Sequence, residues 1–183
     1  MVSDQLSSTR TTPTDQRGLA LRLRMKPPGA ALGSVDGGWW PWSDDLVAEL
    51  PVLVAALGAR VGPVNRVSYH LDTWGTMARK APVDGRMVRF EGFRSIDRHT
   101  VVVIGSDHRR VSLLVVPPDA PEGAARAALR SAAGHDSTAS VADILAGNGV
   151  LLDAHHFSPV LIPRARQAEP AEERWETEGG HIW

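Results

Sequence analysis

The chain of 183 residues contains no cysteine, and this absence excludes several kinds of chemistry. Without cysteine there is no disulfide framework, no thiolate nucleophile and no cysteine-ligated zinc or iron–sulfur site. The apolar runs fall far short of the ~20 residues that span a bilayer, and residues 1–18 lack the apolar segment of a signal peptide. We therefore expect a cytoplasmic protein that does not act at a membrane.

Sequence motifs for the common cofactors are also missing. There is no Walker loop, and Gly33, Gly37 and Gly38 do not form the dinucleotide-binding fingerprint. None of the seven histidines has a second histidine four residues further on with a glutamate between them, the spacing of zinc hydrolases. We therefore expect no cofactor and no metal ion, and the sequence favours a protein that is not an enzyme.

Aromatic residues other than tryptophan are scarce, since the chain has one tyrosine and three phenylalanines but six tryptophans. Trp39, Trp40 and Trp42 lie within four consecutive positions of the sequence VDGGWWPWSDD, residues 35–45. The preceding glycines and Pro41 predict an irregular loop there, because both residue types disfavour regular structure. We call residues 35–45 the Trp segment.

Two interpretations of the Trp segment remain open. Exposed indole rings stack on bases, sugars or cations, so its three indoles, with Asp36 before them, form a candidate binding surface. Alternatively, indoles that bury roughly 150 to 250 Å² each hold the segment against the core. We favour the structural interpretation for Trp39 and Trp40. Trp42 and Trp74 are expected to be exposed, and they complete the set of candidate binding tryptophans.

Hydrophobic patterns predict a single domain over residues 19–163, between a disordered tail at 1–18 and a mostly disordered acidic tail at 164–183. Alternation predicts strands at Leu19–Met25 and from Val64. An apolar stripe at helical spacing, from Leu46 to Val61, predicts a helix capped by Ser43. Pro51 within it predicts either a kink or two abutting helices.

The second half of the domain combines further strands with two helices. Asp84-Gly85 predicts a hairpin, and strands are expected from His99 and from Arg109. A capping box that begins at Asp119 predicts a helix, and a shorter helix is expected at 140–147. Strands that follow one another through short links predict an α+β fold: an antiparallel meander sheet of about five strands with helices packed on one face.

Four segments carry a resemblance to a known family. They read GSVDGGWWPWSDDLVAELPVLVAAL from Gly33, VNRVSYHLDTW from Val64, FRSIDRHTVVVIG from Phe93 and LLVVPPD from Leu113. Over about 21–133 the chain resembles a small actinobacterial family of unknown function, DUF5994, with the signature DG(A/G)WWPxSxDL. It departs from the family pattern at Gly38, where alanine is usual, and at Trp42, where a charged residue is common. The resemblance implies a shared fold and supplies no activity.

Charge is unevenly distributed, although the formal net charge is only −1. Residues 60–110 carry ten basic and five acidic side chains between slightly acidic flanks. RNA or the ribosome is one possible partner for such a segment, and solvated arginines on a sheet are the alternative that we favour. The arginines that would contact phosphate are Arg86, Arg89, Arg94, Arg98, Arg109 and Arg110.

Ser68, His70 and Asp72 alternate along one predicted strand and match a nucleophilic triad only in residue type. Alternate strand residues lie ~6.6 Å apart, whereas the contacts of a triad are about 2.6 to 3.2 Å long. A small hydrolase or isomerase with His70, Asp72 and Arg94 in a pocket near the Trp segment is therefore our third hypothesis. RNA or ribosome association is the second. The leading hypothesis is a noncatalytic binding or regulatory module that contacts a partner protein or assembly through the Trp segment.

Overall fold

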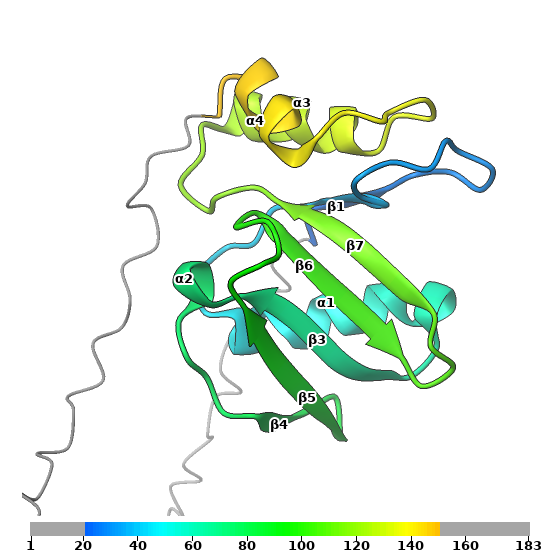
Figure 1. Cartoon of the computed structure of the whole chain (residues 1–183), viewed down its shortest axis with the longest axis vertical. Helices are drawn as coiled ribbons and strands as arrows, with labels where there is room; N and C mark the ends of the chain where they lie inside the picture. Colours follow the sequence, from blue (N-terminus) through cyan, green and yellow to red (C-terminus); the bar gives the residue numbers. More distant parts are fainter. Residues whose placement is uncertain (1–20, 151–183) are drawn as a thin grey trace, which may run out of the picture.

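Residues 21–150, which the computed structural model describes, form a mixed sheet of seven strands with four helices (Figure 1). The predicted α+β class is confirmed. Across the sheet the strands follow the order β1-β2-β7-β6-β3-β5-β4. In chain order the elements are β1 (Leu23–Met25), β2 (Gly37–Trp39), α1 (Leu46–Val61), β3 (Val64–His70), α2 (Leu71–Trp74), β4 (Lys80–Val83), β5 (Arg86–Phe93), β6 (Thr100–Gly105), β7 (Arg110–Val115), α3 (Glu122–Ala132) and α4 (Val141–Gly147).

The predicted antiparallel meander of about five strands is wrong in its pairing. Strand β2 runs parallel to β7, with Gly37 opposite Leu113, and β3 runs parallel to β5, with Val67 opposite Phe90. After β3 the chain turns through α2 and returns as the edge strand β4, so that β5 fills the position beside β3. Alternation and turn residues locate strands along the chain, but they do not specify which strands become neighbours.

Helices pack on both faces of the sheet, whereas the sequence predicts them on one face only. Helix α1 packs on one face, in a core that includes Leu113. Helix α3 packs on the other face over β1 and β2, α4 packs on α3, and this second core includes Leu114. Since Leu113 and Leu114 are adjacent in β7, their side chains point to opposite faces. Figure 1 shows α1 behind the strands, with α3 and α4 above β1 and β7.

Helix α1 continues through Pro51 as one helix, so the chain does not form two abutting helices at that residue. Asp45 is its N-cap instead of the predicted Ser43, because the Asp45 carboxylate accepts hydrogen bonds from the backbone N–H groups two and three residues ahead. Gly62, with φ of 67°, follows the last turn. The buried side chains form the predicted stripe of Leu46, Leu50, Leu53, Leu57 and Val61.

Most other local signals are confirmed. The turn at 84–85 joins β4 to β5, and both of its residues have positive φ. Ser140 caps α4 by accepting a hydrogen bond from the backbone N–H of Asp143. The predicted capping box that begins at Asp119 is wrong, because Pro121 is the N-cap residue of α3 and no side chain accepts a bond there.

The predicted limits of the domain lie outside the described residues. The tail at 1–18, both ends of the domain at 19–163 and the acidic tail at 164–183 all fall beyond residues 21–150. These boundaries therefore stay predictions. In the described range, no helix has the length and apolar character that crossing a bilayer requires.

Lys26 is a buried charged residue that joins two loops beside the second core. Its side chain is 6% exposed, and its Nζ donates hydrogen bonds to the carbonyl oxygens of Ala31 at 3.1 Å and Ser137 at 2.6 Å. These two acceptors lie in the loop before β2 and in the loop after α3. Lys26 therefore connects segments that are more than a hundred residues apart in the chain.

Replacing Lys26 with methionine is expected to lower the free energy of unfolding by about 1–3 kcal/mol, because two part-buried carbonyl groups lose their donor. Urea denaturation followed by far-ultraviolet circular dichroism measures this change. Lys80→Met is the matched control, because Lys80 is exposed, and a surface substitution of this kind changes stability by less than about 0.5 kcal/mol. Equal stabilities for the two variants would show that the Lys26 bonds do not stabilise the fold.

Candidate functional site

Trp39 is part of the core that packs against α1. Its side chain is 1% exposed, and its ring stacks on that of Trp74, with centroids 6.2 Å apart and planes 12° from parallel. Trp74 is 9% exposed, so the expectation that it is exposed is wrong. Helix α2 directs it back onto Trp39, and no sequence signal indicates that contact. Neither indole offers a free face to a partner.

Trp40 follows Trp39 but belongs to the other core, beneath α3. It is 6% exposed, and its Nε1 donates hydrogen bonds to the carbonyl oxygens of Pro117 at 3.1 Å and Pro118 at 3.3 Å. Consecutive strand residues point to opposite faces, so the two indoles enter the two cores. The structural interpretation that we favour for Trp39 and Trp40 is therefore confirmed.

The Trp segment is not entirely the irregular loop that its glycines and proline predict. Gly37–Trp39 is strand β2, inserted between β1 and β7. A Cβ atom on Gly37 would lie 2.4 Å from the carbonyl oxygen of Arg24, and one on Gly38 would lie 2.9 Å from Leu129. The glycines are therefore present because β1 and α3 approach this strand closely.

Asp36 begins the pairing of the Trp segment with β7. Its Oδ2 accepts a hydrogen bond from the backbone N–H of Ser112 at 2.8 Å, and its own N–H donates to the Ser112 carbonyl at 2.7 Å. Its carbonyl oxygen also accepts a bond from the backbone N–H of Lys26. The Asp36 carboxylate, a candidate binding group from the sequence, therefore helps to hold the Trp segment against β7.

Arg22 lies between the indoles of Trp40 and Trp42. Its Cζ is 3.5 Å from the centroid of Trp40 and 3.7 Å from that of Trp42, and its Nε donates to the Trp40 carbonyl at 2.9 Å. A second guanidinium nitrogen donates to the carbonyl of Pro41. The pKa of Arg22 is lowered from its ordinary value because burial disfavours the charged form, and the nearby Glu49 carboxylate opposes this shift only in part. Trp42 is 44% exposed, as expected, and its ring stacks on this arginine.

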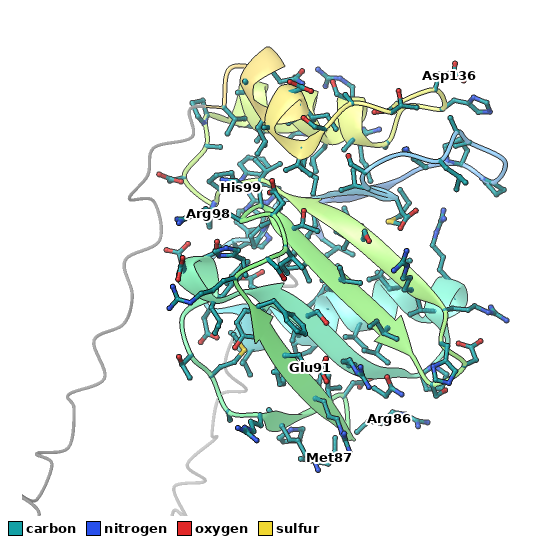
Figure 2. The ribbon with its side chains drawn as sticks, in the orientation of Figure 1. Arg86, Met87, Glu91, Arg98, His99 and Asp136 are labelled. Carbon is teal, nitrogen blue, oxygen red and sulfur yellow. The ribbon has the colours of Figure 1, made fainter. Side chains whose placement is uncertain are left out.

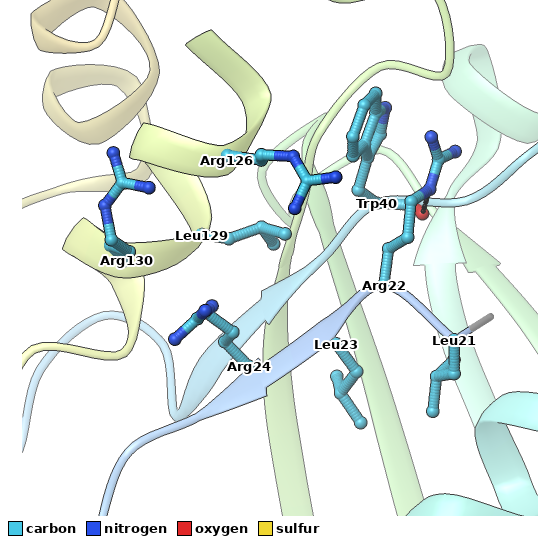
Figure 3. Close-up of a pocket in the computed structure, with 8 residues that line it drawn as sticks. All are labelled: Leu21, Arg22, Leu23, Arg24, Trp40, Arg126, Leu129 and Arg130. Atoms are coloured by element: carbon cyan, nitrogen blue, oxygen red, sulfur yellow. Dashed lines mark hydrogen bonds between the residues drawn. The ribbon is translucent and has the colours of Figure 1, made fainter. Parts of the chain in front are cut away.

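A pocket of about 430 Å³ lies between β1 and α3. Arg22 and Arg24 enter it from the strand side, and Arg126 and Arg130 enter it from the helix (Figure 3). Leu129 lies between the two walls, and Trp40 lies beside Arg22 at one end. The full lining is Leu21, Arg22, Leu23, Arg24, Trp40, Arg126, Leu129 and Arg130.

The positive charge of this pocket is only partly balanced by acidic groups. Arg126 forms an ion pair with Glu122 at 2.7 Å. Arg24 and Arg130 are exposed, and neither forms an ion pair or a side-chain hydrogen bond with any residue between 21 and 150. Two guanidinium groups on opposite walls thus face a shared space without a counterion from the described chain.

The sequence alone did not identify these four arginines as one group, although the spacing within each pair indicates a shared face. Arg22 and Arg24 are the basic positions of the predicted strand Leu19–Met25, and alternate strand positions share one face. Arg126 and Arg130 are four residues apart, so they lie on the same side of a helix. What could not be predicted is that α3 would pack over β1, since the sequence does not indicate which face of the sheet α3 covers.

His70, Asp72 and Arg94 do come together, but not as a catalytic relay. The Nδ1 of buried His70 accepts a hydrogen bond from the backbone N–H of Asp72 at 3.1 Å. In a triad that nitrogen would instead donate to the carboxylate. The Asp72 carboxylate contacts Arg94 at 3.1 Å and Arg98 at 3.4 Å. The arrangement caps α2 and ties the loop after β5 to it.

The six arginines named for phosphate contact divide into two groups. Arg94 and Arg98 share Asp72, and Arg109 pairs with Asp107 at 2.9 Å. The remaining three are exposed and have no ion pair within the described part of the chain; they are Arg86, Arg89 and Arg110. Among residues 21–150, no three histidine, aspartate or glutamate side chains gather where they would hold a metal ion.

Comparison with known proteins gives a family and no function. No curated protein and no solved structure matches the chain. The model of a family of unknown function, DUF5994, matches residues 22–132, which include β1, the Trp segment, the whole sheet and α3. This is the stretch over which the sequence resembles that family, and the chain therefore belongs to DUF5994.

Proposed function

We propose that the domain is a binding module that holds a small anionic ligand between β1 and α3. The observation that carries this proposal is the pair Arg24 and Arg130, which face one pocket from opposite walls without an acidic partner among the described residues. Noncatalytic binding remains our leading hypothesis. Its location moves from the surface of the Trp segment, where Trp39 and Trp40 are buried, to the pocket beside Trp40.

The pocket chemistry favours a carboxylate or phosphate attached to an apolar group. Guanidinium groups form paired hydrogen bonds with both anions, and an anion between like charges relieves their repulsion. A volume of about 430 Å³ lies in the usual range for small-ligand pockets. Leu129 and the edge of Trp40 supply apolar surface between the cationic walls. Arg22 is held by Trp40 and Pro41 carbonyls, so Arg24, Arg126 and Arg130 are the groups that would contact the ligand.

The test measures binding of phosphate, citrate, benzoate and a nucleoside monophosphate by nuclear magnetic resonance, with benzamide as a neutral analogue of benzoate. At least one anion is expected to shift the Trp40 indole N–H signal, while benzamide leaves it unchanged. The double variant Arg24→Ser with Arg130→Ser is expected to weaken that binding at least tenfold, because charge-assisted hydrogen bonds are lost.

The matched control is Arg86→Ser with Arg89→Ser, which removes two exposed arginines from the far end of the sheet. It should leave the anion affinity unchanged. If none of the anions shifts the Trp40 signal, or if both double variants weaken binding equally, the pocket does not bind anions in the way we propose.

A further inference from the structure

Half of the sheet carries no helix on the face opposite α1. Strands β6, β3, β5 and β4 form this half, while α3 packs over β1 and β2 at the other end and α4 packs on α3. Figure 1 shows no described helix in front of β3, β5 and β6. We call this surface the open face.

One row of residues crosses the open face from the edge strand β4 and ends at Arg110 on the adjoining strand β7. Registered partners on neighbouring strands share a face, and the pairings run from Lys80 through Arg89, Arg66 and Ile104 to Arg110. Four of these five side chains are cationic. With neighbouring strands about 4.8 Å apart, the row extends over roughly 19 Å.

Most of the charge in this row is unpaired. Lys80, Arg89 and Arg110 are exposed and have no ion pair with residues 21–150. Arg66 contacts Glu91 at 3.4 Å, and its side chain is 43% exposed. Such half-exposed pairs contribute little to stability and exchange readily with another anion. The row therefore presents a line of positive charge to solvent.

Apolar side chains flank the charged row on the same strand. In β5 the residues that alternate on the open face are Met87, Arg89, Glu91 and Phe93. Met87 is 60% exposed and Phe93 is 41% exposed. Figure 2 shows Met87 at the tip of the β4–β5 hairpin and Glu91 further along β5. Phe93 lies four residues from Arg89 along β5, with Glu91 between them, so its exposed ring offers stacking to a base and the row offers charge to phosphates further along the strand.

We propose that the open face binds single-stranded nucleic acid, with the cationic row along the backbone and Phe93 under a base. A sheet face without a covering helix admits splayed bases, whereas a duplex would hide their faces from Phe93. An acidic protein would satisfy the charges but would leave the aromatic ring without a specific role. This inference is independent of the pocket, because the two sites share no residue.

The experiment measures fluorescence anisotropy of labelled oligouridine and oligothymidine of about 12 nucleotides with the full chain at several salt concentrations. Both probes are expected to bind, and affinity should fall with salt. Arg89→Ser with Arg110→Ser should weaken binding at least tenfold and reduce the slope of log affinity against log salt by about 1.4, since each phosphate contact contributes about 0.7. Phe93→Ala should weaken binding about five- to hundredfold. A preference for one probe would distinguish RNA from DNA as the partner.

The matched control is the pocket variant Arg24→Ser with Arg130→Ser, which should bind the oligonucleotides as the unaltered chain does. Circular dichroism establishes that every variant is folded. Equal losses in the pocket variant, salt-independent binding, or no binding at low salt would overturn the proposal. The proposal would also be overturned if polyglutamate bound as tightly as the oligonucleotides and Phe93→Ala had no effect on binding. The open face would then accept acidic protein chains.

Discussion

Replacing Trp39 with alanine is expected to lower the free energy of unfolding by about 3–5 kcal/mol. The residue is 1% exposed and contacts both the α1 core and the ring of Trp74. The substitution removes that stacking partner and leaves a cavity that the surrounding strands cannot fill without moving. Urea denaturation followed by circular dichroism gives the free energy, because tryptophan fluorescence itself changes with the substitution.

Trp42→Ala is the matched control, three residues away in the same segment. Its side chain is 44% exposed, and its ring stacks on Arg22. Such a cation–π contact at an exposed site contributes about 0.5–1 kcal/mol, so the variant should remain close to the unaltered chain. If the two variants lost the same stability, the distinction between a buried and an exposed indole in this segment would be wrong.

Replacing Gly105 with alanine is expected to prevent folding or to lower the free energy of unfolding by more than about 4 kcal/mol. Gly105 ends β6 opposite Val64, where the chain has just left α1. A Cβ atom there would lie 1.7 Å from the carbonyl oxygen of Val61, which is backbone and not the end of a flexible side chain. The strand and the end of the helix would have to separate. Circular dichroism and the unfolding midpoint in urea measure the loss.

Gly58→Ala is the control for this prediction. Gly58 lies inside α1, and apart from its chain neighbours and the neighbouring backbone of the helix itself no heavy atom comes within 4 Å of a Cβ placed on it. Alanine has the higher helix propensity, so this variant should be as stable as the unaltered chain or more stable by about 1 kcal/mol. A folded Gly105→Ala protein with unchanged stability would mean that α1 and β6 are further apart than the structure shows.

The two consecutive tryptophans of the Trp segment pack on opposite sides of the sheet. Because adjacent positions of an extended chain face opposite sides, Trp39 at the end of β2 reaches the α1 core, and Trp40, the next residue, reaches the α3 core. Pro41 then turns the chain out of the sheet, and Asp45 starts α1. Trp42 remains outside, against Arg22. An unusual cluster of indoles is thus accounted for by packing on two sides of one sheet.

The candidate sites depend on contacts that no local pattern encodes. The sequence places Arg22 and Arg24 on one side of a strand and Arg126 and Arg130 on one side of a helix, about a hundred residues apart. Their meeting in one pocket requires α3 to pack over β1. Likewise, the row across the open face exists only because β5 lies between β3 and β4.

By itself the sequence determined the α+β class, the extent of α1, the hairpin at 84–85, the strands β3, β6 and β7 and the short helix α4. Those features depend on the spacing of apolar residues and on the residue types that favour turns, and both are set by residues close together in the chain. Only the tertiary structure decided the strand order, the two parallel pairs, the placement of helices on both faces and the burial of Trp74. These follow from packing between residues far apart in the chain, where one arrangement has the lowest total free energy although several satisfy the same local pattern.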